Sequence, residues 1–212
     1  KSPVVEAFRT LRTNLQYANV DGELRSILVT SSGPGEGKST ISANLACVLA
    51  QSGQRVIAVG ADLRKPALHK QFGASGNGRG VTNILVGQAT LKDCLKPSGE
   101  QDLQLLPSGP IPPNPVELLQ TPRMKTLVEE LTEQADVVIF DAPPVVPVTD
   151  SAVLAPLVDG VLLVINAGTV PREIARQSKE QLEKVGGRIL GVVLNRVDVK
   201  EGYSYYYYYY DE

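Results

Sequence analysis

The run Thr30 to Thr40 contains residues that could bind the phosphates of a nucleotide. Its small residues let backbone N–H groups curl around phosphate oxygens. Lys38 supplies a positive charge for the outer phosphates, and the hydroxyl of Ser39 suits Mg²⁺. An apolar stretch precedes the run and a helix-like stretch follows it, so the helix would point its positive end at the same anion. The residues expected to contact the nucleotide are Gly33, Pro34, Gly35, Glu36, Gly37, Lys38, Ser39 and Thr40. The alternative is a chance glycine-rich turn.

Two acids follow other apolar runs and could complete such a site. Asp141 ends the run 137–140 and begins Asp-Ala-Pro-Pro, where a carboxylate could hold Mg²⁺ directly or through water. The alternative is an aspartate that caps a turn. Asp62 follows the run 55–59 and is a second carboxylate near the phosphates, while Arg64 could bind phosphate or pair with a neighbouring acid. For this segment the alternative is a solvated turn.

The elements that would position these residues follow from the apolar pattern. Helical spacing of Val4, Phe8, Leu11 and Leu15 predicts a helix that starts at Ser2-Pro3 with one apolar stripe. Further helices are expected over 41–51, from the cap Thr121-Pro122 onward, and over 171–185, the last closed by Gly186-Gly187. Strands are expected at 26–29, 55–59, 103–106, 137–140, 161–165 and 189–194.

Apolar strands that alternate with helices predict an α/β fold, with a mostly parallel twisted sheet and helices on both faces. Ligands of such sheets bind outside the carboxyl ends of the strands. The loop before Lys38, the acids Asp62 and Asp141, and Asn195 should therefore meet at one edge. Two connecting segments are also expected, a glycine-rich loop at 73–80 and a rigid proline-rich connection at 107–115.

Composition restricts the class of protein. The chain has 212 residues, which suits one domain with a full core, and its net charge of −2 argues against general nucleic-acid affinity. Two cysteines, Cys47 and Cys94, are too few for a disulfide framework and indicate buried free thiols in a reducing compartment. No apolar run reaches the roughly 18 residues of a membrane-spanning helix. The chain opens on Lys1, so we expect a cytosolic piece of a longer protein.

The end of the chain is rich in tyrosine. Seven of the eight tyrosines lie in the last ten residues, which no packing rule requires. The structural alternative is a sticky low-complexity tail, because termini are commonly disordered. The functional interpretation is an array of phenolic hydroxyls, each of which would gain about 1.5 to 2 negative charges on phosphorylation. The expected phosphoacceptors are Tyr203, Tyr205, Tyr206, Tyr207, Tyr208, Tyr209 and Tyr210.

Taken together, these features resemble the bacterial tyrosine kinases of the polysaccharide co-polymerase type, which are P-loop NTPases related to the ParA and MinD ATPases. The resemblance covers nearly the whole chain. Its motifs are Glu6-x-x-Arg9-x-x-Arg12, the loop 34–40, Ala61 to Pro66, Pro112 to Leu119, Asp141 to Pro144 and the tyrosine tail.

The resemblance implies a protein-tyrosine kinase that uses ATP and Mg²⁺, with Lys38, Asp62 and Asp141 as catalytic residues. Lys38 would contact the β- and γ-phosphates, and Ser39, Asp62 and Asp141 would organise the metal. Residues 1–200 would form the kinase domain and residues 201–212 a flexible tail that a neighbouring subunit phosphorylates.

The implied partners follow from the same family. Glu6, Arg9 and Arg12, in an oligomerisation helix within residues 1–20, would pack subunits into a ring; a plain solvated charged face would give the same pattern. A membrane adaptor, either separate or fused, would activate the kinase at the inner face of the plasma membrane. A tyrosine phosphatase would reset the tail, nucleic acid would play no part, and the pathway served would be polysaccharide synthesis and export.

Two positions depart from the expected patterns. Ser32 stands where such loops usually begin with Gly or Ala. Gly60 stands where the family has the first acid of an Asp-x-Asp pair, which is assigned as the base that accepts the tyrosine proton. Losing a general base typically costs about 10²–10⁴-fold in rate. We therefore expect nucleotide binding with weak or absent tyrosine transfer.

Other assignments stay open at this point. Asn195 and Arg196 follow the last strand and are expected near the adenine base, with a strand-end turn as the alternative. A ParA/MinD-like ATPase is a rival function, but Gly33 stands where those proteins carry a signature lysine. A second rival is a catalytically silent assembly module gated by nucleotide, which Gly60 favours. His69 is expected at the surface.

Overall fold

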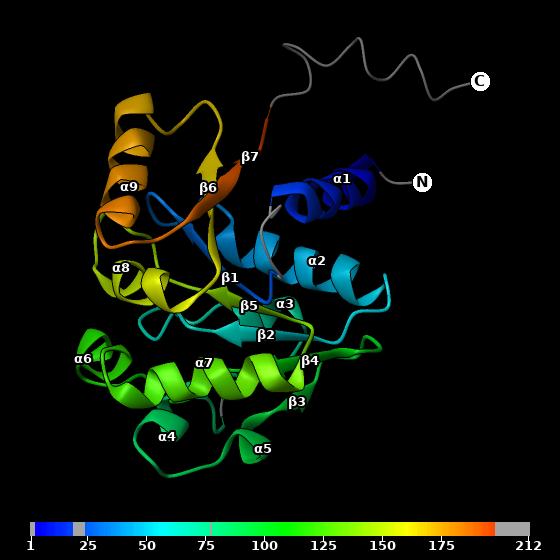
Figure 1. Ribbon diagram of the computed structural model, residues 1–212, viewed down its shortest axis with the longest axis vertical. Coiled ribbons are helices and arrows are strands. Elements are labelled where there is room, and N and C mark those ends of the chain that lie inside the picture. The colour runs from blue at the N-terminus through cyan, green and yellow to red at the C-terminus, as the bar shows by residue number, and fades with distance from the viewer. Residues whose placement is uncertain (1–2, 19–23, 77, 198–212) are drawn as a thin grey trace.

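A computed structural model describes residues 3–18, 24–76 and 78–197 of the chain. Its centre is a sheet in the order β3-β4-β2-β5-β1-β6-β7 (Figure 1). All neighbouring strands are parallel except β3 and β4, which are antiparallel. The strands are β1 (Ser26–Ser31), β2 (Val56–Gly60), β3 (Lys96–Pro97), β4 (Leu103–Leu106), β5 (Val137–Asp141), β6 (Gly160–Asn166) and β7 (Ile189–Asn195).

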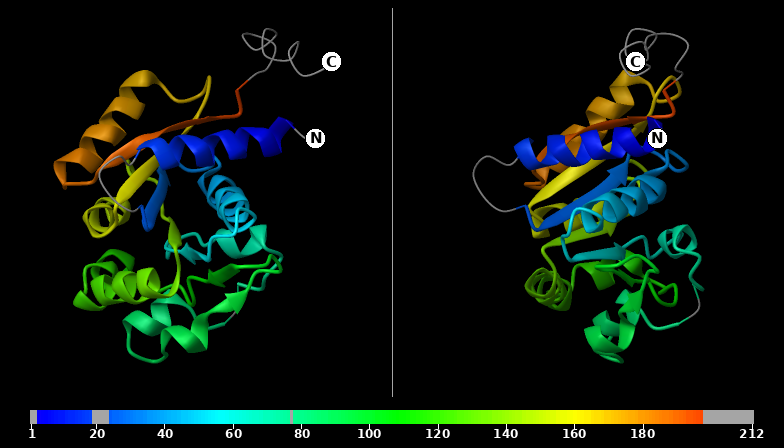
Figure 2. Two further views of the ribbon diagram at one scale, coloured as in Figure 1. Left: turned by 45° about the vertical axis from the view of Figure 1, so that its right-hand side comes forward. Right: turned by 90° about the vertical axis from the view of Figure 1, so that its right-hand side faces the viewer.

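Helices cover both faces of the sheet, as Figure 2 shows from two sides. One face packs against α1 (Pro3–Ala18), α2 (Lys38–Ala50) and α3 (Leu68–Gln71). The other face packs against α4 (Val81–Leu85), α5 (Leu91–Cys94), α6 (Pro115–Leu119), α7 (Pro122–Gln134), α8 (Asp150–Leu154) with the short 3₁₀ helix Ala155–Leu157, and α9 (Arg172–Lys184). The central strands β1, β2 and β5 are buried along their whole length, as a parallel sheet between two helical layers requires.

The six predicted strands are confirmed, and the register explains why the predicted site residues converge. Gly60 at the end of β2 lies opposite Asp141 at the end of β5, and Val29 of β1 also pairs with Asp141. The carboxyl ends of these strands therefore meet beside the loop that follows β1 (Figure 1). The two-residue strand β3 was not predicted, because Lys96-Pro97 carries no apolar pattern.

Several details differ from the prediction. Both faces were expected to be covered, but β7 is an edge strand whose Val192 and Leu194 are more than half exposed. The apolar stripe of α1 begins at Phe8, because Val4 is 62% exposed. Thr121 makes no side-chain cap to α7; its hydroxyl donates to the Leu118 carbonyl instead.

The predicted glycine stop and the free thiols are confirmed, but the predicted burial of both cysteines is wrong for Cys47. Gly186 ends α9 in a left-handed conformation, and the N–H of Gly187 donates back to Leu182 O, as predicted for a glycine stop. Both cysteines are free thiols; Cys94 is buried and Cys47 is half-buried. His69 is partly exposed.

Candidate nucleotide-binding site

The loop between β1 and α2 has the backbone shape of an anion cradle. Gly35 and Gly37 adopt left-handed conformations with φ of 78° and 96°, which favour glycine. At Gly37 a Cβ atom would also lie 2.2 Å from the Asn195 side chain, so only glycine fits there. Because α2 begins at Lys38, the unpaired N–H groups of its first turn face the same space as the loop.

The structure explains why serine stands at position 32, where such loops usually begin with Gly or Ala. Its side chain is buried, and its Oγ accepts a hydrogen bond from Ser178 Oγ of α9 at 2.7 Å. The preceding Ser31 donates from Oγ to Gly33 O at 2.7 Å. The Ser32 hydroxyl therefore links the start of the loop to α9, and the Ser31 hydroxyl links it to the backbone of the loop. Ser178 was missed, because nothing in the spacing of α9 marks it.

Glu36 braces the loop from within. The carboxylate is buried, with Oε1 accepting the N–H of Gly33 and Oε2 accepting the N–H of Asn166 at 3.0 Å. Glu36 O in turn accepts a hydrogen bond from Asn195 Nδ2 at 2.8 Å. The loop is therefore joined to the ends of β6 and β7. Sequence reasoning placed Glu36 among the nucleotide contacts but did not foresee this bracing.

Four side chains from three segments meet at the head of the sheet. Lys38 Nζ donates to Asp62 Oδ2 at 2.9 Å and to Asp141 Oδ1 at 3.3 Å, and Ser39 Oγ donates to Asp141 Oδ2 at 2.6 Å. All four residues are buried. The sequence prediction that these groups lie together is confirmed in its geometry.

Charge and burial act in opposite directions within this cluster. Burial raises the pKa of the Asp141 carboxyl, while Lys38 and the Ser39 hydroxyl oppose that shift. Burial alone would lower the pKa of Lys38, but the attraction of Asp141 and Asp62 outweighs it, so the net pKa of Lys38 is raised. Lys38 therefore carries its positive charge at neutral pH.

Asp62 is held by its own segment as well. Its Oδ1 accepts the N–H groups of Arg64 at 3.2 Å and Lys65 at 2.9 Å, which leaves Oδ2 to Lys38. Of the two roles left open for Arg64, the structure shows an ion pair with an acid, because its guanidinium forms a two-bond fork with Asp150. Asp150 was missed in the sequence.

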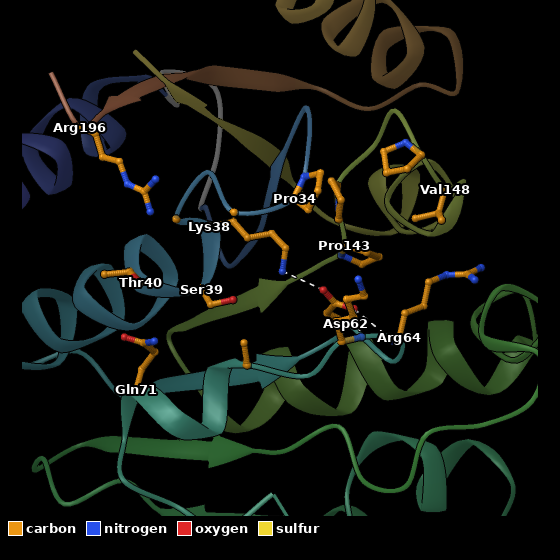
Figure 3. A pocket seen from close by; sticks show the side chains of 16 residues that line it. Pro34, Lys38, Ser39, Thr40, Asp62, Arg64, Gln71, Pro143, Val148 and Arg196 are labelled. Carbon is orange, nitrogen blue, oxygen red and sulfur yellow. Dashed lines mark hydrogen bonds and ion pairs between the residues drawn. The ribbon is translucent and has the colours of Figure 1, made fainter. Parts of the chain in front are cut away.

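A cleft of about 490 Å³ opens over this cluster (Figure 3). Six of the eight loop residues expected to contact nucleotide line it, together with Asp62 and Arg196, while Gly33 and Glu36 do not. At the end near Asp62 and Arg64, the wall is apolar and comes from the segment after β5. The residues of this wall are Pro143, Pro144, Pro147 and Val148.

Asn195 and Arg196 both lie beside the loop, but Arg196 lines the cleft and Asn195 does not. Asn195 packs against Gly37, and Arg196 lines the cleft at the end near Thr40, as Figure 3 shows. The backbone of Arg196 has a φ of 56°, an uncommon conformation for a residue with a side chain. Its N–H donates to Asn195 Oδ1 at 3.0 Å, which orients the amide of Asn195 toward the loop.

Little space is left for a side chain at Gly60. A Cβ atom at residue 60 would lie 2.7 Å from Ser108 Oγ and 3.1 Å from Ser108 N. Ser108 is itself buried. An aspartate at this position therefore requires the Ser108 side chain to rotate away and its backbone to shift by a few tenths of an ångström.

The residues expected to form a subunit contact do not share one environment. Glu6 and Arg9 form an exposed ion pair at 3.2 Å on α1. Arg12 points toward α2 and donates to Val48 O at 3.3 Å. The seven tail tyrosines, Tyr203 and Tyr205 to Tyr210, lie outside the described residues.

Within residues 3–18, 24–76 and 78–197, no cluster of three or more His, Cys, Asp or Glu side chains could hold a metal ion by itself. Mg²⁺ commonly uses one or two protein carboxylates together with substrate phosphates, which suits Asp62 and Asp141. In the same ranges, no helix has both the length and the apolar character needed to cross a membrane.

Comparison with known proteins identifies relatives over most of the chain. A family model described as an AAA domain matches residues 24–186. The tyrosine-protein kinase YwqD of Bacillus subtilis (strain 168) is 42% identical over 208 residues, covering 97% of this chain and 87% of the relative.

Solved structures agree with this match. The kinase domain of the Escherichia coli tyrosine kinase ETK superposes with a TM-score of 0.85 at 35% identity, covering 95% of this chain and 80% of that one. The septum site-determining protein MinD of Pyrococcus horikoshii, complexed with Mg-ADP, has a TM-score of 0.72 at 25% identity, covering 84% and 72%. The predicted P-loop NTPase fold is confirmed by these neighbours.

Proposed function

The chain belongs to the bacterial tyrosine-protein kinases, and we propose that it transfers the γ-phosphoryl group of ATP to tyrosines of its own C-terminal tail. The observation that carries the proposal is the buried cluster of four side chains beside the glycine-containing loop between β1 and α2. The cluster consists of Lys38, Ser39, Asp62 and Asp141. Cationic, hydroxyl and carboxylate groups in this arrangement are those that phosphoryl transfer requires.

The cleft gives the bound nucleotide a direction. Lys38 would contact the β- and γ-phosphates, and the first turn of α2, at Thr40, would contact the α-phosphate. The nucleoside would then extend toward Arg196 and the γ-phosphate toward Asp62, which both line the cleft. The apolar wall from Pro143 to Val148 lies beyond that end, where an aromatic acceptor ring would enter.

The oxygen atoms present fit Mg²⁺. Ser39 and Asp141 would hold the ion, and Asp62 would hold it or its waters. Bound there with the phosphates, Mg²⁺ supplies positive charge that stabilises the charge developing on the transferred group. The chain's own residues would position the phosphates: the loop N–H groups would orient them, and Lys38 Nζ would contact them. The neighbouring structure of MinD complexed with Mg-ADP supports the binding of a magnesium nucleotide by this fold.

In the proposed reaction the tyrosine oxygen forms a bond to the γ-phosphorus, the bond from that phosphorus to the bridging oxygen breaks, and ADP leaves. The phenolic proton must pass to a base or to water. Gly60 has no side chain to accept this proton. Asp62 is the carboxylate that lines that end of the cleft, so it would be the acceptor. Glycine at position 60 therefore predicts slow transfer with nucleotide binding preserved.

Intact mass spectrometry after incubation with ATP and Mg²⁺ tests the transfer. We expect slow, stepwise addition of phosphate groups that stops at no more than seven on the tail. A variant with Phe at the seven tail positions keeps only Tyr17 and should gain nothing. Equal phosphate uptake by that variant would contradict the tail as acceptor.

Gly60 also favours a second candidate, a nucleotide-gated assembly module without transfer. It predicts a change of particle mass with ATP and Mg²⁺ but no covalent phosphate. Measuring particle mass and phosphate content on the same sample separates the two functions. The ParA/MinD-type ATPase is less well supported, because Gly33 stands at the position of the signature lysine.

For the cellular setting we propose the arrangement implied by the family. Subunits would form a ring through Glu6, Arg9 and Arg12, each offering its tail to the next site. A membrane adaptor, separate or fused, would hold the kinase at the inner face of the plasma membrane. A tyrosine phosphatase would reset the tail, and the pathway served would be polysaccharide synthesis and export.

A further inference from the structure

The first two residues of α8 are fully buried, and the proposed reaction gives neither of them a task. Asp150 Oδ1 accepts Nε of Arg64 at 2.9 Å, and Asp150 Oδ2 accepts Nη2 of the same guanidinium at 3.0 Å. Ser151 Oγ donates to Pro143 O and lies 3.0 Å from Thr30 Oγ1. Thr30 Oγ1 donates to the same carbonyl at 2.7 Å. The start of α8 therefore has polar contacts with three different segments.

Each of those segments carries part of the nucleotide site. Thr30 lies in β1, which leads into the phosphate-binding loop. Pro143 follows Asp141 by two residues, and Arg64 follows Asp62 by two residues. The start of α8 thus fixes the spacing between the loop and the two catalytic acids.

The link to Asp62 is direct. The backbone N–H groups of Arg64 and Lys65 hold Asp62 Oδ1, and Lys38 takes Oδ2. The Arg64 guanidinium points away from Lys38 and toward the segment after β5, as Figure 3 shows. The fork to Asp150 therefore anchors the peptides that set the direction of the Asp62 carboxylate.

A contribution to folding stability is a weak explanation for the ion pair between Arg64 and Asp150. Burying a carboxylate is costly unless it is paired, and a buried ion pair often contributes no more than apolar side chains of the same size. A planar two-bond fork does, however, fix geometry. We propose that Asp150 is a positioning residue which, through Arg64, orients Asp62 toward Lys38 and the magnesium-bound phosphates. The inference rests on the proposed function, because it assigns a role within the same site.

The chain provides a matched control pair. Arg55 precedes β2 and Asp136 precedes β5, and their side chains form an ion pair at 2.6 Å. This pair lies at the amino ends of β2 and β5, opposite to the strand ends that carry the site, and is exposed. Its removal changes the charge count equally without touching the site.

The experiment compares Asp150→Asn, Arg64→Ala/Asp150→Ala and Arg55→Ala/Asp136→Ala with the unaltered full chain. Calorimetry gives the factor by which Mg²⁺ strengthens ATP binding, and urea unfolding gives stability. Groups that orient metal ligands typically change metal affinity or activity 10–100-fold. We expect Asp150→Asn to reduce the Mg²⁺ factor about tenfold. The double variant at 64 and 150, which leaves no lone buried charge, should regain stability but not the Mg²⁺ factor. The control pair should change neither.

In the double variant, the strengthening of ATP binding by Mg²⁺ could return to its original value together with stability. That result would overturn the positioning role, because it would show that the Arg64–Asp150 pair contributes to stability alone. A factor unchanged in every variant would also overturn it. In both cases the unaltered chain still binds ATP, so the proposed function survives. If the unaltered chain binds no ATP, both proposals fail together.

Discussion

At the scale of single residues, Lys38 is the centre of the site. It is buried between two carboxylates that raise its pKa, although burial alone would lower that pKa. The sequence predicted that Lys38, Ser39, Asp62 and Asp141 meet, because the ends of parallel strands share one edge. It did not predict Asp150 or Ser178, because an isolated polar residue at the start or in the middle of a helix carries no periodic signal.

Replacing Lys38 by Met should abolish nucleotide binding and destabilise the fold. Removing one partner of a buried ion pair costs about 3–5 kcal/mol. Because the folded-state pKa of Lys38 is raised above its ordinary value of 10.5, its contribution is present below that pH and is lost as the pH rises through the raised value. Urea unfolding of both proteins from pH 7 upward should show a free-energy difference that shrinks above about pH 10.5. A difference that stays constant or grows in that range would contradict this assignment.

Introducing an acid at position 60 should speed tyrosine transfer. A general base is worth about 10²–10⁴-fold in rate. Because the new Cβ would lie 2.7 Å from Ser108 Oγ, the variant Gly60→Asp/Ser108→Gly should gain more than Gly60→Asp alone. Anti-phosphotyrosine detection over time measures the rate, with Ser108→Gly as the control. An unchanged rate in both Gly60→Asp variants would refute the defect assigned to Gly60.

At the scale of elements, the loop is shaped by strands that lie far from it in sequence. Glu36 contacts Asn166 at the end of β6 and Asn195 at the end of β7. The long apolar strands and the amphipathic helices were predicted from their periodicity. The two-residue strand β3 and the exposed face of β7 were not, since both depend on which neighbours the folded chain supplies.

Removing the amide of Asn195 should loosen the phosphate-binding loop. In Asn195→Ala, Glu36 O loses the hydrogen bond that it accepts at 2.8 Å. An unsatisfied polar group of this kind costs about 1–3 kcal/mol. We expect ATP affinity, measured by calorimetry, to fall about five- to tenfold, since 1.4 kcal/mol corresponds to a factor of ten.

Leu194→Thr is the matched control, because Leu194 lies on the same strand and is 62% exposed. It should leave ATP affinity and stability nearly unchanged. Equal losses in the two variants would point to a general disturbance of β7, and an unaltered affinity in Asn195→Ala would count against a role for this strand end in the site.

At the scale of the whole molecule, the candidate site lies at the carboxyl ends of the strands, and α1 packs on one face of the sheet (Figure 1). The fold class was predictable from the alternation of apolar strands and helices. Assembly was not, because Glu6 and Arg9 form an exposed pair that a solvated helix would also show.

Reversing the charge of Arg9 should weaken the proposed ring. Arg9→Glu places a second negative charge beside Glu6 on the exposed face of α1. Light scattering with ATP and Mg²⁺ should show smaller particles than for the unaltered chain. Lys125→Glu reverses a charge that is more exposed than Arg9 and lies beside Glu129 on α7, and it should leave the particle mass unchanged. The same loss in both variants would indicate a net-charge effect and not a contact through α1.

The most direct test is titration calorimetry of the purified chain with ATP and Mg²⁺. We predict saturable binding at one site per chain, weakened when Mg²⁺ is withheld and absent in Lys38→Met. No uptake of ATP or ADP with Mg²⁺ in excess, or equal uptake by Lys38→Met, would contradict the nucleotide site and the kinase function built on it.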